Sequence, residues 1–239
     1  MNLHFQTVEQ HLKKLNCIDA NQIKLNYQYL ELLLQVNQKT NLTSITNWEE
    51  AVIKHLYDSL MLTEIEDLTK REQILDLGTG AGLPGIPLAL AYPEHKIYLM
   101  EASKKKAEFL KLAKHKLKLN NTTVLNERAE TLGHNAEHRG VYDLVVARAV
   151  AELTVLLELA APFCQRNGLF IAYKGPHFSS ELNGANQALR ILGMEIHRIV
   201  RYELPLSMGA RALLIFKKCG DTPPQYPRRP GIPAKRPLR

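Results

Sequence analysis

The sequence predicts an α/β protein in which a helical extension precedes a mostly parallel sheet of seven strands that ends in an antiparallel hairpin. Three observations point to this fold class. Apolar residues recur at helical spacing up to about residue 62, short apolar runs alternate with helical stretches after residue 71, and a short loop joins the last two runs. Strands alternating with helices are typical of a parallel sheet, whereas a short connection requires antiparallel neighbours.

Two helices are predicted in the extension. In the first, the residues of the buried stripe lie three or four positions apart: Ile23, Tyr27, Leu30 and Leu34. This spacing is that of an amphipathic helix, and Thr40 and Asn41 are residue types that favour a helix end. A second helix is predicted over 48–62.

The rest of the chain divides into strands and intervening helices. Strands are predicted over 73–77, 96–101, 122–126, 142–147, 169–173, 195–203 and 212–217. Helices are predicted over 87–92, 103–119, 151–163 and 179–192. The connection 204–209 is short enough for a hairpin. We therefore divide the chain into a helical extension over 1–70, an α/β domain over 71–218 and a tail over 219–239.

The composition is that of a globular protein, with 45% hydrophobic and 23% charged residues. No apolar run approaches the ~18 residues that a membrane-spanning helix needs, and residues 1–6 lack the layout of a signal peptide. A cytoplasmic protein with no membrane partner is expected. The three Cys are widely spaced and the nine His have no further ligands clustered around them, so no metal site is predicted.

The tail carries most of the net charge. The chain has a formal charge of +7, and residues 218–239 contain six Lys and Arg against one acid. The same stretch holds six of the twelve prolines. Proline is excluded from helix interiors and central strands, so we expect the tail to run extended and to display its cations to an anionic partner.

A glycine-rich segment, 76–85 (DLGTGAGLPG), directly follows the first predicted strand. Gly78, Gly80 and Gly82 allow a tight turn and let a ligand approach the backbone closely, so they are candidate cofactor contacts. The later glycines also satisfy the G-x-G-x-x-G spacing of dinucleotide-binding folds. The glycines therefore predict a nucleotide-like cofactor without choosing between S-adenosylmethionine and NAD.

Polar residues at three further strand ends favour S-adenosylmethionine. Glu101 can accept both ribose hydroxyls of an adenosine, or else cap the next helix. Ala129 and Glu130 follow the third strand, where an amide and a carboxylate can read an adenine edge. Arg148 follows the fourth strand, where it can meet the carboxylate of a methionine moiety or serve as a structural ion-pair partner.

With these residues in place, the chain closely resembles one family, the bacterial small-subunit ribosomal RNA guanine-N7 methyltransferases, called RsmG or glucose-inhibited division protein B. The matching segments occur in order along nearly the whole chain: 41–43 (NLT), 55–59 (HLYDS), 75–87 (LDLGTGAGLPGIP), 128–130 (RAE), 148–151 (RAVA) and 226–237 (YPRRPGIPAKRP). Many methyltransferases share the glycine-rich segment, whereas its combination with the extension and the tail is far more specific.

The resemblance implies a Rossmann-like class I methyltransferase fold, with 71–218 as the methyltransferase domain and S-adenosylmethionine as the cofactor. It implies a cofactor site drawn from Gly78, Leu83, Ala129, Glu130 and Arg148, with Glu101 at the ribose. Leu83 stands where many members have Phe, and a packing role tolerates that change. The implied substrate is a guanine of 16S rRNA near the decoding centre, within an assembling small-subunit particle.

Methylation at N7 of guanine requires no general base, because this nitrogen carries a lone pair and no proton. No side chain is assigned as catalytic, and holding the nitrogen in line with the methyl group is the main task. The segment 147–150 (ARAV) is not the Asn-Pro-Pro-Tyr or Asp-Pro-Pro-Tyr of enzymes that methylate exocyclic amines. Asp58 is a candidate for stabilising the methylated purine, or forms a buried hydrogen-bonding cluster with His55 and Ser59.

For RNA binding, the tail supplies four candidate cations: Arg228, Arg229, Lys235 and Arg236. They would neutralise phosphates and make the affinity salt-dependent, or else belong to a basic tail that serves solubility. We expect truncation after Gly220 to weaken rRNA binding and to leave cofactor affinity intact. A monomer is expected. Two rival functions remain: an NAD-dependent oxidoreductase, which has no use for Arg148 or the tail, and a non-catalytic RNA-binding assembly factor.

Overall fold

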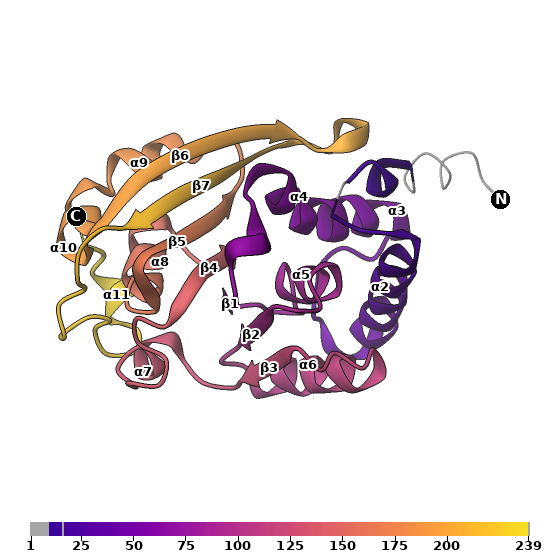
Figure 1. The fold of residues 1–239 in the computed structure, drawn as a ribbon, viewed down its shortest axis with the longest axis horizontal. Helices are drawn as coiled ribbons and strands as arrows, with labels where there is room; N and C mark the ends of the chain where they lie inside the picture. The colour runs from indigo at the N-terminus through magenta and orange to yellow at the C-terminus, as the bar shows by residue number, and fades with distance from the viewer. Residues whose placement is uncertain (1–9, 16, 239) are drawn as a thin grey trace.

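The computed structural model describes residues 10–15 and 17–238 as a central sheet with helices on both faces (Figure 1). Residues 1–6, which are not expected to form a signal peptide, lie outside the described residues. Arg239, which contributes to the charge of the tail, lies outside them as well. Within the described ranges, no helix is long and apolar enough to cross a membrane. The same ranges hold no group of three His, Cys, Asp or Glu residues that is placed to bind a metal ion.

The sheet contains seven strands in the described part of the chain: β1 (Gln73–Leu77), β2 (Lys96–Met100), β3 (Thr122–Leu125), β4 (Tyr142–Arg148), β5 (Cys164–Lys174), β6 (Met194–Glu203) and β7 (Ala210–Lys218). Their order is β3-β2-β1-β4-β5-β7-β6. Pairs among β1 to β5 are parallel, and β7 is antiparallel to both β5 and β6. The predicted parallel sheet and its closing hairpin are confirmed.

Two elements of the sheet domain differ clearly from the prediction. β5 begins at Cys164 and not at 169. An irregular stretch lies between the pairs Tyr142–Cys164 and Leu144–Leu169. The polar residues of this stretch resemble a turn in the sequence, so the first part of the strand was not predicted. The helix predicted over 179–192 is two helices, α9 (Ser179–Asn183) and α10 (Asn186–Leu192). Gly184 lies at the break, and glycine lowers the stability of a helix interior.

The extension contains the helices α2 (Ala20–Thr40), α3 (Trp48–Ala51) and α4 (Asp58–Ile65). α2 ends as predicted, where Asn41 adopts a left-handed conformation with φ 50°. The helix predicted over 48–62 is not uniform, because a π-helical turn, Val52–Tyr57, joins α3 to α4. Such turns are rare and often lie at functional sites. His55, Asp58 and Ser59 are all buried at this point.

The remaining helices of the described chain are α5 (Gly85–Ala91), α6 (Lys104–Lys116), α7 (Ala129–Leu132), α8 (Leu153–Ala160) and α11 (Ile232–Lys235). Alternate residues of the strands face two separate cores. Ile74 packs with the helical extension, whereas Leu75 packs with α8 and α10. The hydroxyl of Tyr29 in α2 donates to the carbonyl of Ala81 at 2.8 Å. The extension therefore covers one face of the sheet and reaches the glycine-rich loop.

The described part of the tail, 219–238, is folded back onto the sheet domain. The expectation of a wholly extended tail is wrong at α11, a single helical turn. Pro233 lies at its second position, where a helix needs no backbone donor. Pro227 and Pro233 are buried. The proposed domain boundaries at 70 and 218 stay predictions.

Candidate cofactor and acceptor sites

The loop between β1 and α5 has the conformation that its glycines predict. Gly78, Gly80 and Gly82 have φ values of 70°, 62° and 103°, all in the region that side chains disfavour. At Gly82 an added Cβ would lie 2.4 Å from Cδ1 of Ile86. Glycine is therefore required there both for the backbone conformation and for the close approach of the next helix.

Asp76 holds the two ends of this loop together. Its Oδ2 accepts hydrogen bonds from the Thr79 hydroxyl and from the Gly85 amide, the latter at 2.7 Å. The side chain is completely buried. Burial raises the pKa of Asp76 to about 7, although the two hydrogen bonds act in the opposite direction. The carboxyl is a structural support of the loop beneath the ligand-facing surface.

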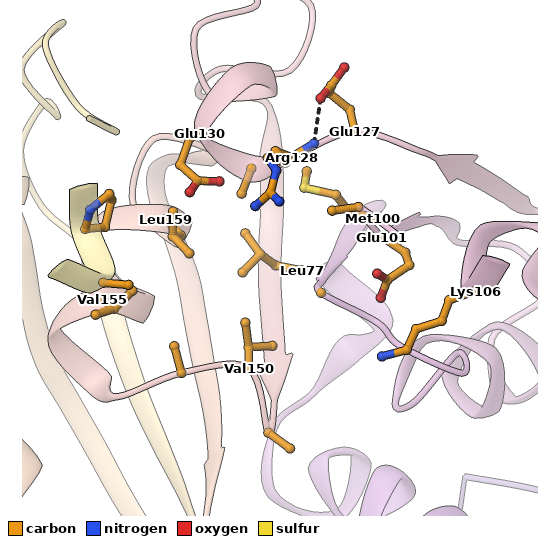
Figure 2. A pocket seen from close by; sticks show the side chains of 17 residues that line it. Leu77, Met100, Glu101, Lys106, Glu127, Arg128, Glu130, Val150, Val155 and Leu159 are labelled. Atoms are coloured by element: carbon orange, nitrogen blue, oxygen red, sulfur yellow. Dashed lines mark hydrogen bonds between the residues drawn. The ribbon is translucent and has the colours of Figure 1, made fainter. Parts of the chain in front are cut away.

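A cavity of about 370 Å³ lies over the carboxyl ends of β1 to β4. Figure 2 shows Glu101 and Lys106 on one side of it and Glu130, Val155 and Leu159 on the other. The volume falls within the range of roughly 300–1,000 Å³ that is usual for small-molecule sites. In open parallel sheets this edge is where ligands bind.

The donor and acceptor set of this cavity fits an adenosine-containing cofactor. Glu101 is buried, and its two oxygens accept from the amides of Gly80 at 3.0 Å and Ser103 at 2.7 Å. Each carboxylate oxygen keeps a lone pair for a ribose hydroxyl. Leu77 and Met100 provide apolar walls for a purine. Both roles predicted for Glu101, capping and ligand contact, are thus geometrically compatible.

The structure brings together only some of the predicted site residues. Gly78, Glu101, Ala129 and Glu130 line the cavity. The Gly80 amide lies behind Glu101 as its hydrogen-bond donor. Leu83 is buried in the core shared with the helical extension, and neither it nor Arg148 is among the lining residues.

Arg148 instead forms a buried ion pair. Its Nη1 lies 3.1 Å from Oδ2 of Asp58 and also donates to the carbonyl of Lys54 at 2.9 Å. The other carboxylate oxygen of Asp58 accepts from the Tyr202 hydroxyl at 2.7 Å. This geometry is the ion-pair alternative for Arg148. The cluster expected for Asp58 with His55 and Ser59 is not formed as predicted, because Asp58 bonds to Arg148 and Tyr202, His55 bonds to Thr43, and the buried Ser59 hydroxyl has no hydrogen-bond partner among the described residues.

A second cavity, of about 350 Å³, adjoins the first. Ala149 and Ala151 line both cavities, and Ala149 has a φ of 56°, which is unusual for a residue with a side chain. Asp58 and Arg148 form part of the second cavity. The two cavities therefore meet at the segment that follows β4.

The second cavity has a basic rim and a neutral histidine. Lys54, Lys174 and Arg211 line it. Burial lowers the pKa of His55 to about 4, and the charge of Arg148 adds to the effect, so the imidazole is uncharged at neutral pH. Its Nε2 lies 2.9 Å from the Thr43 hydroxyl. The sequence reasoning missed all three basic residues, which come from distant segments and form no local pattern.

The fold and the first cavity define a class I S-adenosylmethionine-dependent methyltransferase. Two solved structures share this fold. A SAM-dependent O-methyltransferase from Thermotoga maritima aligns with a TM-score of 0.55 at 15% identity, over 79% of this chain and 71% of that one. The cofactor-bound protein Rv0187 from MTB aligns with a TM-score of 0.57 at 16% identity, over 80% and 89%.

The sequence comparisons identify the family. The family model described as rRNA small subunit methyltransferase G matches residues 22–206. Proteins of that name are 44% identical in Carboxydothermus hydrogenoformans, over 92% of this chain and 94% of the relative, and 39% identical in Pelotomaculum thermopropionicum, over 100% of both. The chain belongs to this family. Membership confirms the predicted enzyme class and cofactor, those of an S-adenosylmethionine-dependent rRNA methyltransferase.

Proposed function

We propose that the protein methylates N7 of a guanine in the 16S rRNA of the small ribosomal subunit, near the decoding centre. The observation that carries this proposal is the pair of cavities that share Ala149 and Ala151. A cofactor in the first cavity and an everted base in the second would face each other across this segment. The three basic residues on the rim of the second cavity would bind the phosphates that flank such a base, in competition with the carboxylates of Glu50, Glu181 and Asp58, to which they are paired.

In the first cavity, Glu101 would accept the ribose hydroxyls, and Ala129 and Glu130 would read the adenine edge. Gly80 orients Glu101 through its amide, and Leu83 supports the loop by packing. Arg148 remains our proposed partner for the carboxylate of the methionine moiety, in competition with Asp58, to which it is already paired. When bound, S-adenosylmethionine supplies an electrophilic methyl group on a sulfonium.

The residues of the chain act by positioning and by electrostatics. Guanine N7 has no proton to lose, so neither His55 nor Asp58 needs to act as a base. Orienting two reactants in this way contributes up to roughly 7–11 kcal/mol to lowering a barrier. Asp58 would stabilise the positive charge that methylation leaves on the purine. We propose that the protein acts as a monomer.

The tail would bind RNA through four cations, three of which are freely accessible. Arg229, Lys235 and Arg236 are exposed, and each phosphate they neutralise would steepen the salt dependence of binding. Arg228 is different, because its guanidinium is bonded to the buried Glu158. A phosphate would have to compete with that carboxylate, so Arg228 is the weakest of the four proposed RNA contacts.

Mass spectrometry of nucleosides from the rRNA of a strain lacking this gene tests the proposal. Loss of 7-methylguanosine from 16S rRNA, restored by the wild-type gene, is expected. Retained 7-methylguanosine would refute the activity and favour the assembly-factor alternative. Purified protein with labelled cofactor, given naked 16S rRNA or small-subunit particles from that strain, identifies the form of the substrate. Calorimetry with S-adenosylhomocysteine against NADH separates methyltransferase from oxidoreductase.

The proposal also includes the oligomeric state and the cellular location of the protein. Sedimentation of the purified protein should give the mass of a single chain, and a stable dimer would contradict the proposed monomer. An enzyme acting on small-subunit rRNA works where ribosomes assemble, so we place the protein in the cytoplasm. Fractionation of cells should recover it with free or immature small subunits and not with membranes.

A further inference from the structure

The tail reaches the first cavity. Pro233 and Ala234, both in α11, are among the residues that line it. The amide of Gly231, the N-cap residue of α11, donates to Oε1 of Glu130 at 3.1 Å. Glu130 itself lines the cavity from α7, and Figure 1 places α11 beside α8. One wall of the cavity is thus made from a segment 101 positions away from Glu130 in sequence.

A charge pair fixes this segment in place. Oε1 of Glu158 accepts from the backbone amide and Nε of Arg228 at 2.8 and 2.9 Å, and Oε2 accepts from Nη2 at 2.6 Å. Glu158 is completely buried. Arg228 Nη2 also donates to the carbonyl of Arg236 at 2.7 Å. Arg228 therefore links the body of the protein to both sides of α11, in the bidentate geometry that carboxylates bind best.

The stretch before Arg228, residues 222–227, is also hydrogen-bonded to the rest of the protein. Arg139 donates to the carbonyls of Thr222, Pro223 and Tyr226, at 2.9, 3.2 and 2.8 Å. The imidazole of His134 lies 2.7 Å from the Pro227 carbonyl. Because the segment is fixed at several points, the position of Pro233 and Ala234 is part of the fold and not a chance contact of a free tail.

We infer that the tail is a part of the cofactor site. Pro233 and Ala234 form the wall of the S-adenosylmethionine cavity, and Arg228 with Glu158 positions that wall. The inference rests on the proposed function only in taking S-adenosylmethionine as the occupant of the first cavity. It replaces the expectation that cofactor affinity is independent of the tail, since removing the segment after Gly220 would remove the wall together with the RNA-binding cations.

Two neighbouring arginines provide a matched test in the full-length protein. Arg228→Ala and Arg229→Ala remove the same charge, but only Arg228 is paired with Glu158. Isothermal calorimetry with S-adenosylhomocysteine should show an affinity about tenfold weaker for Arg228→Ala and within about twofold of wild type for Arg229→Ala. Equal affinities for wild type and both variants would overturn the inference.

A second variant keeps the test decisive if Arg228→Ala does not fold. Ala234 is exposed at the mouth of the cavity, so Ala234→Trp adds bulk to the wall and leaves the Arg228 pair intact. It should weaken S-adenosylhomocysteine binding about tenfold or more. Unchanged affinity in this variant would overturn the inference as well.

Hydrogen exchange gives a readout without any substitution. Adding S-adenosylhomocysteine to the wild-type protein should slow exchange at the amides of Gly231, Lys235 and Arg236, all of which are hydrogen-bonded. No change there, with protection at the glycine-rich loop, would mean that the ligand binds without the tail. Failure of the wild type to bind the ligand at all would instead refute the proposed function, so the two failures are distinguishable.

Discussion

Asp76 offers the sharpest test of the electrostatics of the loop. It is completely buried, and burial raises its pKa to about 7 against the hydrogen bonds from Thr79 and Gly85. Asp76→Asn keeps the shape of the side chain and removes its titration. The prediction concerns how the free energy of unfolding of the variant, relative to wild type, changes with pH.

The sign and size of this pH dependence follow from the linkage between proton binding and folding. The pKa of Asp76 is raised from 3.8 to about 7 on folding, so between these values the folded state binds more protons than the unfolded state. Stability that Asp76 contributes at low pH is therefore lost as pH rises through this window. Roughly three pH units at ~1.4 kcal/mol each amount to about 4 kcal/mol. Wild type should lose this amount relative to Asp76→Asn between pH 4 and pH 8.

Urea unfolding of both proteins across this pH range measures the difference. Other groups titrate equally in the two proteins, so they cancel. Asp221→Asn, which changes an exposed carboxylate, serves as the control. A wild-type minus variant difference that stays constant with pH would refute the reasoning. A change of opposite sign would mean that the hydrogen bonds from Thr79 and Gly85 outweigh burial.

Three further predictions concern the two cavities. Glu101→Gln should weaken S-adenosylhomocysteine binding about tenfold in calorimetry, because an amide nitrogen cannot accept from the loop amides or from ribose; unchanged affinity would exclude Glu101 from the site. Arg148→Met should lower the free energy of unfolding by about 3 kcal/mol, the lower end for a broken buried pair, since the buried carboxylate of Asp58 keeps only the more distant Arg211, at 4.0 Å. In a double-mutant cycle by urea denaturation, Asp58→Asn should recover part of this loss, and strictly additive costs would argue against the pairing. Gly85→Ala should cost about 1–3 kcal/mol, because an added Cβ would lie 2.3 Å from Cδ2 of Leu99; an unchanged melting temperature would show that the loop can relax.

The parts of the fold that sequence predicts are those encoded locally. β1 was predicted at its observed bounds, 73–77, because its apolar run stops directly at glycines that only a turn accommodates. Glu101 was found because a carboxylate at a strand end is a local signal. The parallel direction of β1 to β5 and the hairpin of β6 and β7 also follow from local information, since helices join most of the parallel strands and a short loop joins β6 to β7; the order of the strands was not predicted.

Long-range pairings were not predictable in this way. Arg228 and Glu158 are 70 positions apart, and Asp58 and Tyr202 are 144 apart. No periodicity links such partners, so the sequence did not identify Glu158 as the partner of Arg228 or Asp58 as the partner of Arg148 and Tyr202. The RNA contact of Arg228 and the cofactor contact of Arg148 stay predictions. The π-helical turn at Val52–Tyr57 was missed for a related reason: tertiary packing, and not helix propensity, selects such a turn.

The strand order has a consequence for synthesis of the chain. β7 lies between β5 and β6, so β6 has no neighbour in the sheet until β7 has emerged from the ribosome. Until then the edge of β5, with buried residues such as Phe170 and Ile171, is open to pairing with other chains. The nascent protein therefore passes through a stage in which most of its sheet is complete and its most apolar edge is exposed. Aggregation and chaperone binding should concentrate on nascent chains that stop short of residue 210.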